Sequence, residues 1–582
     1  MKTPLSFCSF LLFSFLLFSF LPSYGQNPNC YRITFSNKND SPYSVDRPEE
    51  FLSPRAIAKR ERFNIPVIEQ DLPVNPHYID SILNFSSEPS QIISKSKWDN
   101  SVVILYPETE NCHAIIDEML NHFSFVIDTL PVAYYKLPFI SDTAKYRTTP
   151  VNMQISNAIT YCSSSCDYDY GKSIDNIKLH KGELLHKAGF CGEGMLICTF
   201  EGSWEGIDTV SYFKPLYENG QILGTRDLVP GVNNVYIGNK DHPLYDYIKW
   251  HGAATLSEMA CCIEGEFVGT APKAQYFLIR TENEWGENLV EEDFYAYGTE
   301  IADSLGADVV SVSLGYTTFD YEWQNHYTPA NNDGVTSIAS RAASILAQKG
   351  VIVVNAAGNE GSSDWHYIVR PADAFNILAV GAVTNYGLIA YYSSYGPSAD
   401  GRVKPDVVSP GWGAWVIKEN ITQAGGTSSA TPIIAGLSAC LWQALPQYTS
   451  LEIMDLIRKY GNRYNNPHNK YGYGIPDFYQ CYLDQTYGVA ENIKPEVLVY
   501  PNPTTGELRV EISDMRYEIS DIEIYDLYGR KYLVSSLTSQ VSNHLIVSSS
   551  NHLINIAHLA AGIYFLKITT EAGMITKKII KY

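Results

Sequence analysis

Three short stretches carry side chains of the kind that acyl-transfer chemistry uses, and the first holds a serine. AGGTSSATP places Ser428 after two glycines, where an apolar helical pattern begins. At a helix N-terminus the unpaired backbone N–H groups and the positive end of the helix dipole stabilise developing negative charge. A nucleophilic hydroxyl on Ser428 would therefore have an oxyanion-stabilising amide in its own backbone. The plainer interpretation is a helix N-cap, a role that serine often fills.

The other two stretches hold a candidate base and a candidate amide donor. His251 stands beside a glycine in KWHGAAT, where another helical pattern begins. Asn359 follows an apolar run and lies between glycines in AAGNEG, where its side-chain amide could donate to an oxyanion. Each has an ordinary alternative, because histidines often have structural roles and asparagine favours turns. The chemistry is therefore inferred from the three stretches together.

An acid completes the set if the apolar run that ends at Glu201 is a buried strand. LICTFEGSW is largely apolar and then breaks on Glu201 and a glycine. A carboxylate in that place could orient a histidine and stabilise its protonated form. Asp208, seven residues further on, is the alternative acid. It lies beyond the predicted end of the strand, where its reach to His251 is poor.

The elements that would position these residues alternate along the central region. GMLICTF, QYFLIR, DVVSVSLG, VIVVNAAG and ILAVGAV predict buried strands, and helical periodicity occupies segments between them. Gly350 is a C-terminal stop for one of these helices. Strands that alternate with helices predict an α/β domain whose central parallel sheet is covered by helices on both faces.

The chain is expected to form several domains, because 582 residues are too many for one core. Changes in composition and in predicted secondary structure mark their boundaries. Residues 1–25 have the charge, apolar run and small-residue end of a signal peptide. Residues 27–140 show a compact α+β pattern, and the polar residues 141–165 are a predicted linker. The α/β domain spans 166–487, and short alternating strands over 496–582 predict a C-terminal β-sandwich.

Charge, hydropathy and cysteine spacing exclude several classes of protein. The net charge of −21 argues against nucleic-acid binding, because neutralising phosphates needs clustered lysine and arginine. The N-terminal apolar run is near the lower length of a membrane anchor, but its small-residue end and missing basic stop-transfer flank favour cleavage. We therefore expect an exported mature chain without a transmembrane anchor. Nothing resembles the paired CxxC units of a metal site.

Taken together, the central motifs resemble those of the subtilisin-like serine proteases. The matching stretches are GTSSATP at 426–432, HG at 251–252 and AGNEG at 357–361. SVSLGY at 311–316 is similar to the substrate-binding strand of that family. The order acid, histidine, serine is also the subtilisin order. The resemblance covers roughly residues 170–485. It implies a subtilisin-like domain that cuts protein or peptide substrates.

By this resemblance, roles pass to individual residues. Ser428 matches the nucleophile, and His251 matches the general base that takes its proton. Asn359 matches the oxyanion-hole side chain, which acts with the Ser428 backbone N–H. Ser429 stands where the family usually has methionine and is the lesser nucleophile candidate. The residues that match the strand pairing with extended substrate are Ser313, Leu314 and Gly315.

The acid and the segment after the base depart from the family pattern. Ungapped alignment places Glu201 on the family aspartate, with its carboxylate one methylene further out, and a misplacement of about 1 Å can cost about a hundredfold in rate. Ala253 stands where a threonine normally follows His-Gly. Two functions therefore stay open: a working serine endopeptidase, or a cell-surface pseudoprotease that binds peptides or partners without cutting. The complete serine motif and Asn359 favour the enzyme.

The flanking regions resemble processing and sorting modules. The segment beginning FLSPRAIAKRER resembles the N-terminal propeptide of secreted bacterial subtilases. VYPNPTTGELRVEI with GIYFLKI resembles the C-terminal sorting domain of the type IX secretion system. That resemblance implies export through the periplasm and outer membrane by the type IX machinery, followed by release or surface attachment. A separate binding domain and an ordinary β-sandwich module are the respective alternatives.

The inferred chemistry requires no cofactor. Structural calcium is common in the family that the chain resembles, but no loop of this sequence is specific enough to assign a site. We therefore expect catalysis by side chains and backbone amides alone.

Overall fold

A computed structural model describes most of the chain outside its N-terminal segment and the predicted linker. The predicted signal peptide, 1–25, and the predicted linker, 141–165, lie outside the described residues. Within these residues, no helix is long and apolar enough to cross a membrane. The chain divides into two compact units, 1–482 and 483–582. The described ranges are 27–86, 89–107, 112–135, 166–230, 234–236, 238, 240, 245–283, 286–324, 327–487, 497–512, 519–527, 529–532, 538–539, 551–570 and 573–582.

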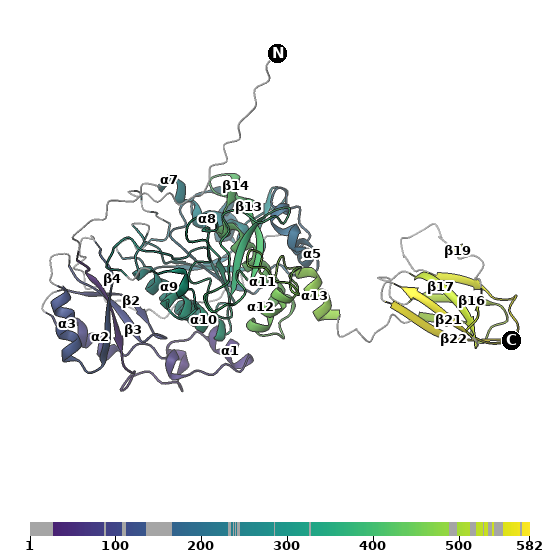
Figure 1. Ribbon diagram of the computed structural model, residues 1–582, viewed down its shortest axis with the longest axis horizontal. Coiled ribbons are helices and arrows are strands. Elements are labelled where there is room, and N and C mark those ends of the chain that lie inside the picture. Colours follow the sequence, from purple (N-terminus) through teal and green to yellow (C-terminus); the bar gives the residue numbers. More distant parts are fainter. Residues whose placement is uncertain are drawn as a thin grey trace, which may run out of the picture. The chain divides into compact units, whose positions relative to one another are not determined.

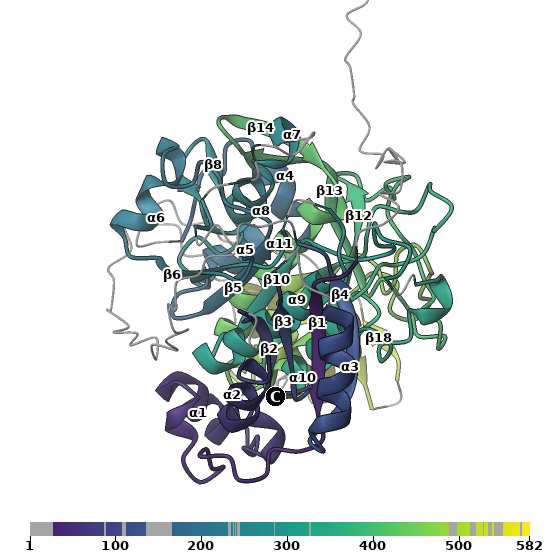
Figure 2. The ribbon, with the colours of Figure 1, turned by 90° about the vertical axis from the view of Figure 1, so that its left-hand side faces the viewer.

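Residues 27–135 form a four-stranded antiparallel sheet in the order β2–β3–β1–β4, and helix α3 packs beside β4 (Figure 2). Strand β3 is buried at every position. Its alternate residues Val102 and Ile104 pack with Ile116 of α3, whereas Val103 and Leu105 join the core of the following domain. The sheet is therefore covered on both faces, in the α+β arrangement that the sequence predicts. The elements are β1 (Cys30–Phe35), α1 (Pro54–Arg62), α2 (Pro76–Leu83), β2 (Gln91–Ser96), β3 (Ser101–Leu105), α3 (Cys112–His122) and β4 (Val126–Ala133).

An eight-stranded sheet lies at the centre of the next region, in the order β14–β13–β12–β11–β10–β5–β9–β6. Its strands are parallel except β14, which runs antiparallel to β13. Every residue of β5, β10 and β11 is buried. Such apolar central strands are typical of a parallel sheet covered on both faces. The strands are β5 (Leu196–Glu201), β6 (Ile222–Asp227), β9 (Gln275–Arg280), β10 (Val309–Val312), β11 (Ile352–Ala356), β12 (Leu378–Thr384), β13 (Val407–Ile417) and β14 (Ile421–Gly425).

Helices cover this sheet. Helix α11 packs along β10 to β13 and against α8. Helix α9 packs against α10, beside which it lies in Figure 1, and contacts β5 and the N-terminal sheet. Gly350, with φ +86°, follows α10 where the sequence predicts the helix stop. A short hairpin of β7 (Cys262–Ile263) and β8 (Phe267–Val268) follows α8. The helices are α4 (Ile174–Ile177), α5 (Gly182–Lys187), α6 (Lys214–Glu218), α7 (Tyr245–Ile248), α8 (His251–Ala260), α9 (Val290–Leu305), α10 (Ile338–Gln348), α11 (Thr427–Ala444), α12 (Ser450–Lys459) and α13 (Phe478–Tyr487).

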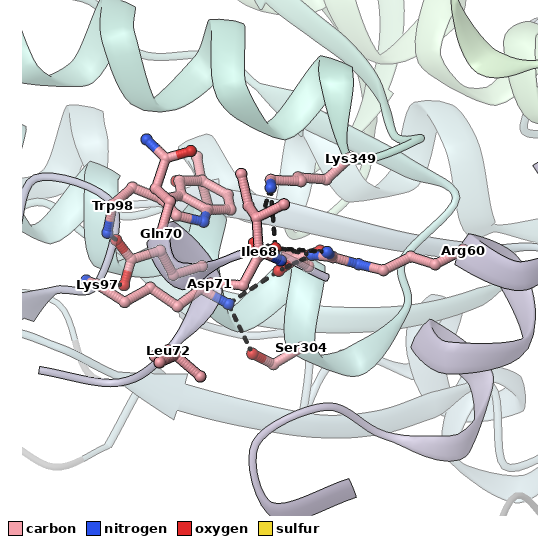
Figure 3. Close-up of polar contacts among 12 residues, drawn as sticks. Arg60, Ile68, Gln70, Asp71, Leu72, Lys97, Trp98, Ser304 and Lys349 are labelled. Carbon is pink, nitrogen blue, oxygen red and sulfur yellow. Dashed lines mark hydrogen bonds and ion pairs between the residues drawn. The ribbon is translucent and has the colours of Figure 1, made fainter. Parts of the chain in front are cut away.

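A buried network of alternating charges joins the N-terminal sheet region to α9 and α10. Arg60 lies 2.9 Å from Asp71 and 2.8 Å from Asp303 of α9. Lys349, just after α10, lies 2.9 Å from Asp71, and Lys97 lies 2.8 Å from Asp303. Figure 3 shows Arg60 and Lys349 converging on Asp71, whose pKa they hold far below its ordinary value. Each buried charge has an opposite partner, as burial of charge requires.

Residues 497–582 form two four-stranded sheets, β15–β16–β20–β19 and β18–β17–β21–β22. Leu508 and Ile554 of one sheet share a core with Ile524 and Leu566 of the other. Two sheets that bury a common apolar layer form a β-sandwich, as the sequence predicts. The strands are β15 (Val497–Tyr500), β16 (Glu507–Ile512), β17 (Ile519–Asp526), β18 (Lys531–Tyr532), β19 (Thr538–Ser539), β20 (Asn551–Asn555), β21 (Gly562–Thr570) and β22 (Gly573–Lys581).

Candidate active site

The predicted acid and base meet at the carboxyl end of the central sheet. Glu201 is the last residue of β5, and its side chain is 2% exposed. His251 is the first residue of α8, and its Nδ1 lies 2.7 Å from Oε2 of Glu201. Gly252 permits this approach, because a Cβ built on it would lie 2.1 Å from the Ser203 carbonyl oxygen. The start of α8 therefore lies directly against the chain that leaves β5.

A threonine that the sequence analysis missed holds the second carboxylate oxygen. The Thr255 hydroxyl lies 2.8 Å from Oε1 of Glu201 and 3.1 Å from the Gly252 carbonyl oxygen. Thr255 is four residues after His251 in α8, so both side chains lie on one face of the helix. That spacing is the signal that could have identified it. A hydroxyl does lie near the acid, although it comes from Thr255 and not from position 253.

The alternative acid lies on the surface. Asp208 is exposed in a turn that follows β5. Ala253, where the family pattern has threonine, is fully buried. The structure thus pairs His251 with Glu201 through a direct contact.

A second buried carboxyl group, Glu258, lies further along α8. No motif of the sequence predicts that it is buried near the site. Its side chain is buried, and desolvation raises the pKa of Glu258 well above its ordinary value. The charge of Glu201 raises that pKa further, while the Ser429 hydroxyl lowers it. Burial of Glu258 therefore favours its neutral form over a second negative charge beside Glu201.

The candidate nucleophile lies in the first turn of α11. Ser428 is the second residue of that helix and is half-buried. Gly426, at the N-cap, has φ +138°, a conformation that favours glycine. The Ser428 hydroxyl donates to the Ser313 carbonyl oxygen at 3.3 Å, and the Ser313 hydroxyl donates to the Ser428 carbonyl oxygen at 2.9 Å. The start of α11 is thereby fixed to the chain that leaves β10.

Asn359 lies beside this helix start. Its Oδ1 accepts hydrogen bonds from the Thr427 backbone N–H at 2.9 Å and from the Thr427 hydroxyl at 3.2 Å. A Cβ built on Gly426 would lie 3.6 Å from the Ser428 nitrogen and 3.7 Å from Nδ2 of Asn359. Oδ1 of Asn359 lies 3.8 Å from the same point, so the Asn359 amide and the Ser428 nitrogen both border the space beside Gly426.

The predicted substrate strand continues from the end of β10. Ser313 is buried, Leu314 is half-buried and Gly315 is exposed. The Leu314 carbonyl oxygen accepts a hydrogen bond from Nδ2 of Asn355 at 3.1 Å. All seven candidate site residues predicted from the sequence therefore lie near the carboxyl ends of neighbouring strands, where open α/β sheets bind ligands. They are Glu201, His251, Ser313, Leu314, Gly315, Asn359 and Ser428.

The described residues contain no cluster of side chains that could form a metal site. Within these residues, no group of three or more His, Cys, Asp or Glu side chains could hold a metal ion. Cys166 forms a disulfide bond with Cys191. Catalysis without a cofactor stays a prediction.

Family models match three consecutive parts of the chain. Residues 221–474 match the subtilase family. The central domain is a subtilase domain. Its matched span includes His251, Asn359 and Ser428, whereas Glu201 lies before it.

The other two matches flank the subtilase domain. Residues 30–145 match the peptidase S8 propeptide domain of Bacteroidota, and residues 498–582 match the secretion system C-terminal sorting domain. Both resemblances drawn from the sequence are confirmed. A propeptide and a type IX sorting tail indicate a secreted or cell-surface protein.

Several subtilases are similar to this chain. M-protease of Shouchella clausii (strain KSM-K16) is 25% identical over 389 residues, which cover 66% of this chain and 86% of the relative. Subtilisin NAT of Bacillus subtilis subsp. natto is 26% identical over 292 residues, which cover 50% of this chain and 66% of the relative. A solved structure of a mutant protease domain of PatA has a TM-score of 0.40 at 18% identity, covering 51% of this chain and 98% of that one. The family and the curated relatives support a subtilisin-like serine protease.

Proposed function

We propose that this protein is a secreted serine endopeptidase that hydrolyses peptide bonds with Ser428, His251 and Glu201. The observation that carries the proposal is the 2.7 Å contact between Oε2 of Glu201 and Nδ1 of His251. It provides the His251 ring with a buried carboxylate despite the departure from the family aspartate. A histidine oriented in this way is the general base that a serine nucleophile requires.

The proposed reaction begins with proton transfer from Ser428. Because Nδ1 of His251 faces Glu201, Nε2 is the ring nitrogen that takes the proton from the Ser428 hydroxyl. The serine oxygen attacks the peptide carbonyl carbon, and His251 then gives the proton to the leaving amine as the C–N bond breaks. Water hydrolyses the resulting acyl-enzyme by the same proton transfers in reverse. Glu201 stabilises the imidazolium in both halves of the reaction.

Backbone and amide groups complete the proposed site. Nδ2 of Asn359 and the Ser428 backbone N–H would donate to the oxyanion, since both border the point beside Gly426. An extended substrate would pair with the main chain of residues 313–315. No step needs a metal ion or an organic cofactor.

The flanking regions support maturation and export of this enzyme. Residues 27–135 are held to α9 and α10 by the buried charge network, as expected of a propeptide that folds with its protease. We infer export through the periplasm and outer membrane by the type IX machinery, which would recognise the C-terminal domain. The mature enzyme would act on protein or peptide substrates outside the cell.

Active-site labelling tests the proposal. The propeptide-free wild type should react with a fluorophosphonate probe at Ser428, because only an activated serine reacts rapidly with this reagent. Ser428→Ala should abolish labelling, whereas the matched control Ser429→Ala should retain it. Absence of labelling in correctly folded wild type would overturn the enzyme and favour the peptide-binding pseudoprotease.

A further inference from the structure

We propose that residues 53–72 anchor the N-terminal region, residues 27–135, to the amino end of the central sheet. The anchored region stays bound after the linker is cut and leaves the active site open. This binding surface and its occupant go beyond the proposed peptidase function. The anchor contacts and the catalytic residues lie at opposite ends of the same strands.

Helix α1 contacts the turns that lead into two central strands. Arg55 donates to the Gly194 carbonyl oxygen at 2.9 Å, and its guanidinium pairs with Asp308. The Lys59 ammonium donates to the Ala307 carbonyl oxygen. Gly194 leads into β5, whereas Ala307 and Asp308 lead into β10. Helix α1 therefore lies against the amino ends of both strands.

Two further contacts extend this surface to β11 and to the end of α11. Lys349, three residues before β11, lies 2.9 Å from Asp71 (Figure 3). The Phe63 ring stacks on the Trp442 ring, with the ring centroids 5.9 Å apart. Trp442 follows Ser428 by 14 residues in α11, which is about 21 Å along the helix axis. The stacked rings are therefore far from the candidate nucleophile.

The candidate site residues lie at the other end of these strands. Glu201 is the last residue of β5, Ser313 follows β10 and Asn359 follows β11. A parallel strand rises about 3.3 Å per residue, so the two ends of β5 are roughly 16 Å apart. A contact at the amino end therefore does not block the carboxyl end.

Apolar contacts hold the N-terminal region to the subtilase domain, and buried ion pairs fix how the two meet. Val103 and Leu105 belong to the core of the subtilase domain. Arg60 and Lys97 each lie 2.8 Å from Asp303 of α9, and these three side chains are at most 8% exposed. Cutting the linker removes none of these contacts, so the N-terminal region should remain in place.

Cutting the linker of the full chain tests this inference. A recognition sequence for a site-specific protease is inserted within residues 141–165, and the cut protein is passed through a size-exclusion column. Residues 27–135 should co-elute with the subtilase domain. A fluorophosphonate added to this complex should label Ser428 within about tenfold of its rate in enzyme freed of the N-terminal region.

Two substitutions weaken the anchor by different routes, and the rate at which the N-terminal region dissociates from the cut protein measures both. Asp303→Asn leaves Arg60 and Lys97 without a buried counter-charge, so this rate should rise by at least about 100-fold. Phe63→Ala removes only the ring that stacks on Trp442 and should raise the rate by about tenfold.

An exposed arginine of the same region provides the matched control. Arg47 pairs with Glu50 of its own region and is 51% exposed, so Arg47→Ala should leave the dissociation rate unchanged. The anchor is overturned if residues 27–135 leave the wild type as fast as they leave Phe63→Ala. It is also overturned if they stay bound and Ser428 labels only after their removal. If Ser428 labels in neither form, the peptidase proposal itself fails, while the dissociation rates still support or overturn the anchor.

Discussion

The two halves of the candidate site are built differently. The nucleophile half follows the family motifs, and backbone groups set much of its geometry: the first turn of α11, the N-cap Gly426 and the chain after β10. The acid half departs from the motifs, and side chains set its geometry, since Glu201 bonds to His251 and Thr255. A backbone arrangement needs its motif intact. A side-chain arrangement can be rebuilt with a different acid and a hydroxyl from another helical turn.

Among the substitutions that test this comparison, Glu201→Gln should lower kcat the most. We expect kcat to fall by about 10⁴-fold, because a neutral amide cannot stabilise the imidazolium and favours the wrong ring tautomer. The measurement is kcat for a peptide substrate, with active sites titrated. The matched control is Asp208→Asn, which should be neutral because Asp208 is exposed. If the Glu201 variant keeps kcat within about tenfold while Asp208→Asn loses it, the acid has been misassigned.

Asn359→Leu tests the nucleophile half. We expect kcat to fall by about 10²- to 10³-fold with little change in KM, because the lost donor acts on charge that develops only in the transition state. Steady-state kinetics on the folded variant separate the two constants. A higher KM with unchanged kcat would instead assign Asn359 to ground-state binding.

Thr255→Val tests whether the missed threonine supports the acid half. Removing a hydrogen bond to a charged group costs about 1.5–3 kcal/mol, so we expect kcat/KM to fall by at least about tenfold. Thr299→Val is the matched control, since the Thr299 hydroxyl is also buried in a helix and donates to the Ala296 carbonyl oxygen. Equal loss in both variants would reduce the Thr255 effect to ordinary helix destabilisation.

Acid pH should lower the folding stability of the region around the nucleophile half, because two buried histidines there become protonated. Desolvation lowers the pKa of His180 and of His186 to about 4. His180 bonds to Ser409 of β13, and His186 lies 3.7 Å from Cys440 of α11. Both are neutral in the folded protein, so their stabilisation is present above pH 6.5 and is lost as pH falls from 6.5 toward 4. Each contributes about 3 kcal/mol across that range.

Urea unfolding midpoints at pH 7 and pH 4.5 measure this loss. A midpoint that is the same at both pH values would contradict the role assigned to His180 and His186.

The nucleophile half was the more predictable from sequence. Ser428 and Asn359 sit in contiguous motifs, because a helix start and a strand end fix them locally. In the acid half, only His251 has such a motif, at the start of α8. Thr255 was missed because its partner, Glu201, is 54 residues away, so only the spacing of four residues from His251 points to the site. Strand β6 was missed because its residues at the sheet edge are mostly half-buried, which weakens the apolar pattern.

Long-range ion pairs were the least predictable feature. Arg60 lies in a helix whose sequence is strongly charged, yet its side chain is buried against Asp303, 243 residues away. Charged residues are almost never fully buried unless they are paired, so sequence alone favours an exposed Arg60. The contact depends on how the propeptide and the subtilase domain pack together, which neither segment encodes locally.

The most direct test of the central claim is kcat/KM of Glu201→Asp against the wild type. The account holds that this site is built around the longer side chain, with one carboxylate oxygen on His251 and the other on Thr255. Aspartate would withdraw the carboxylate by one methylene, and a misplacement of about 1 Å should lower kcat/KM by about a hundredfold. Unchanged or higher activity in a folded Glu201→Asp variant would contradict that claim.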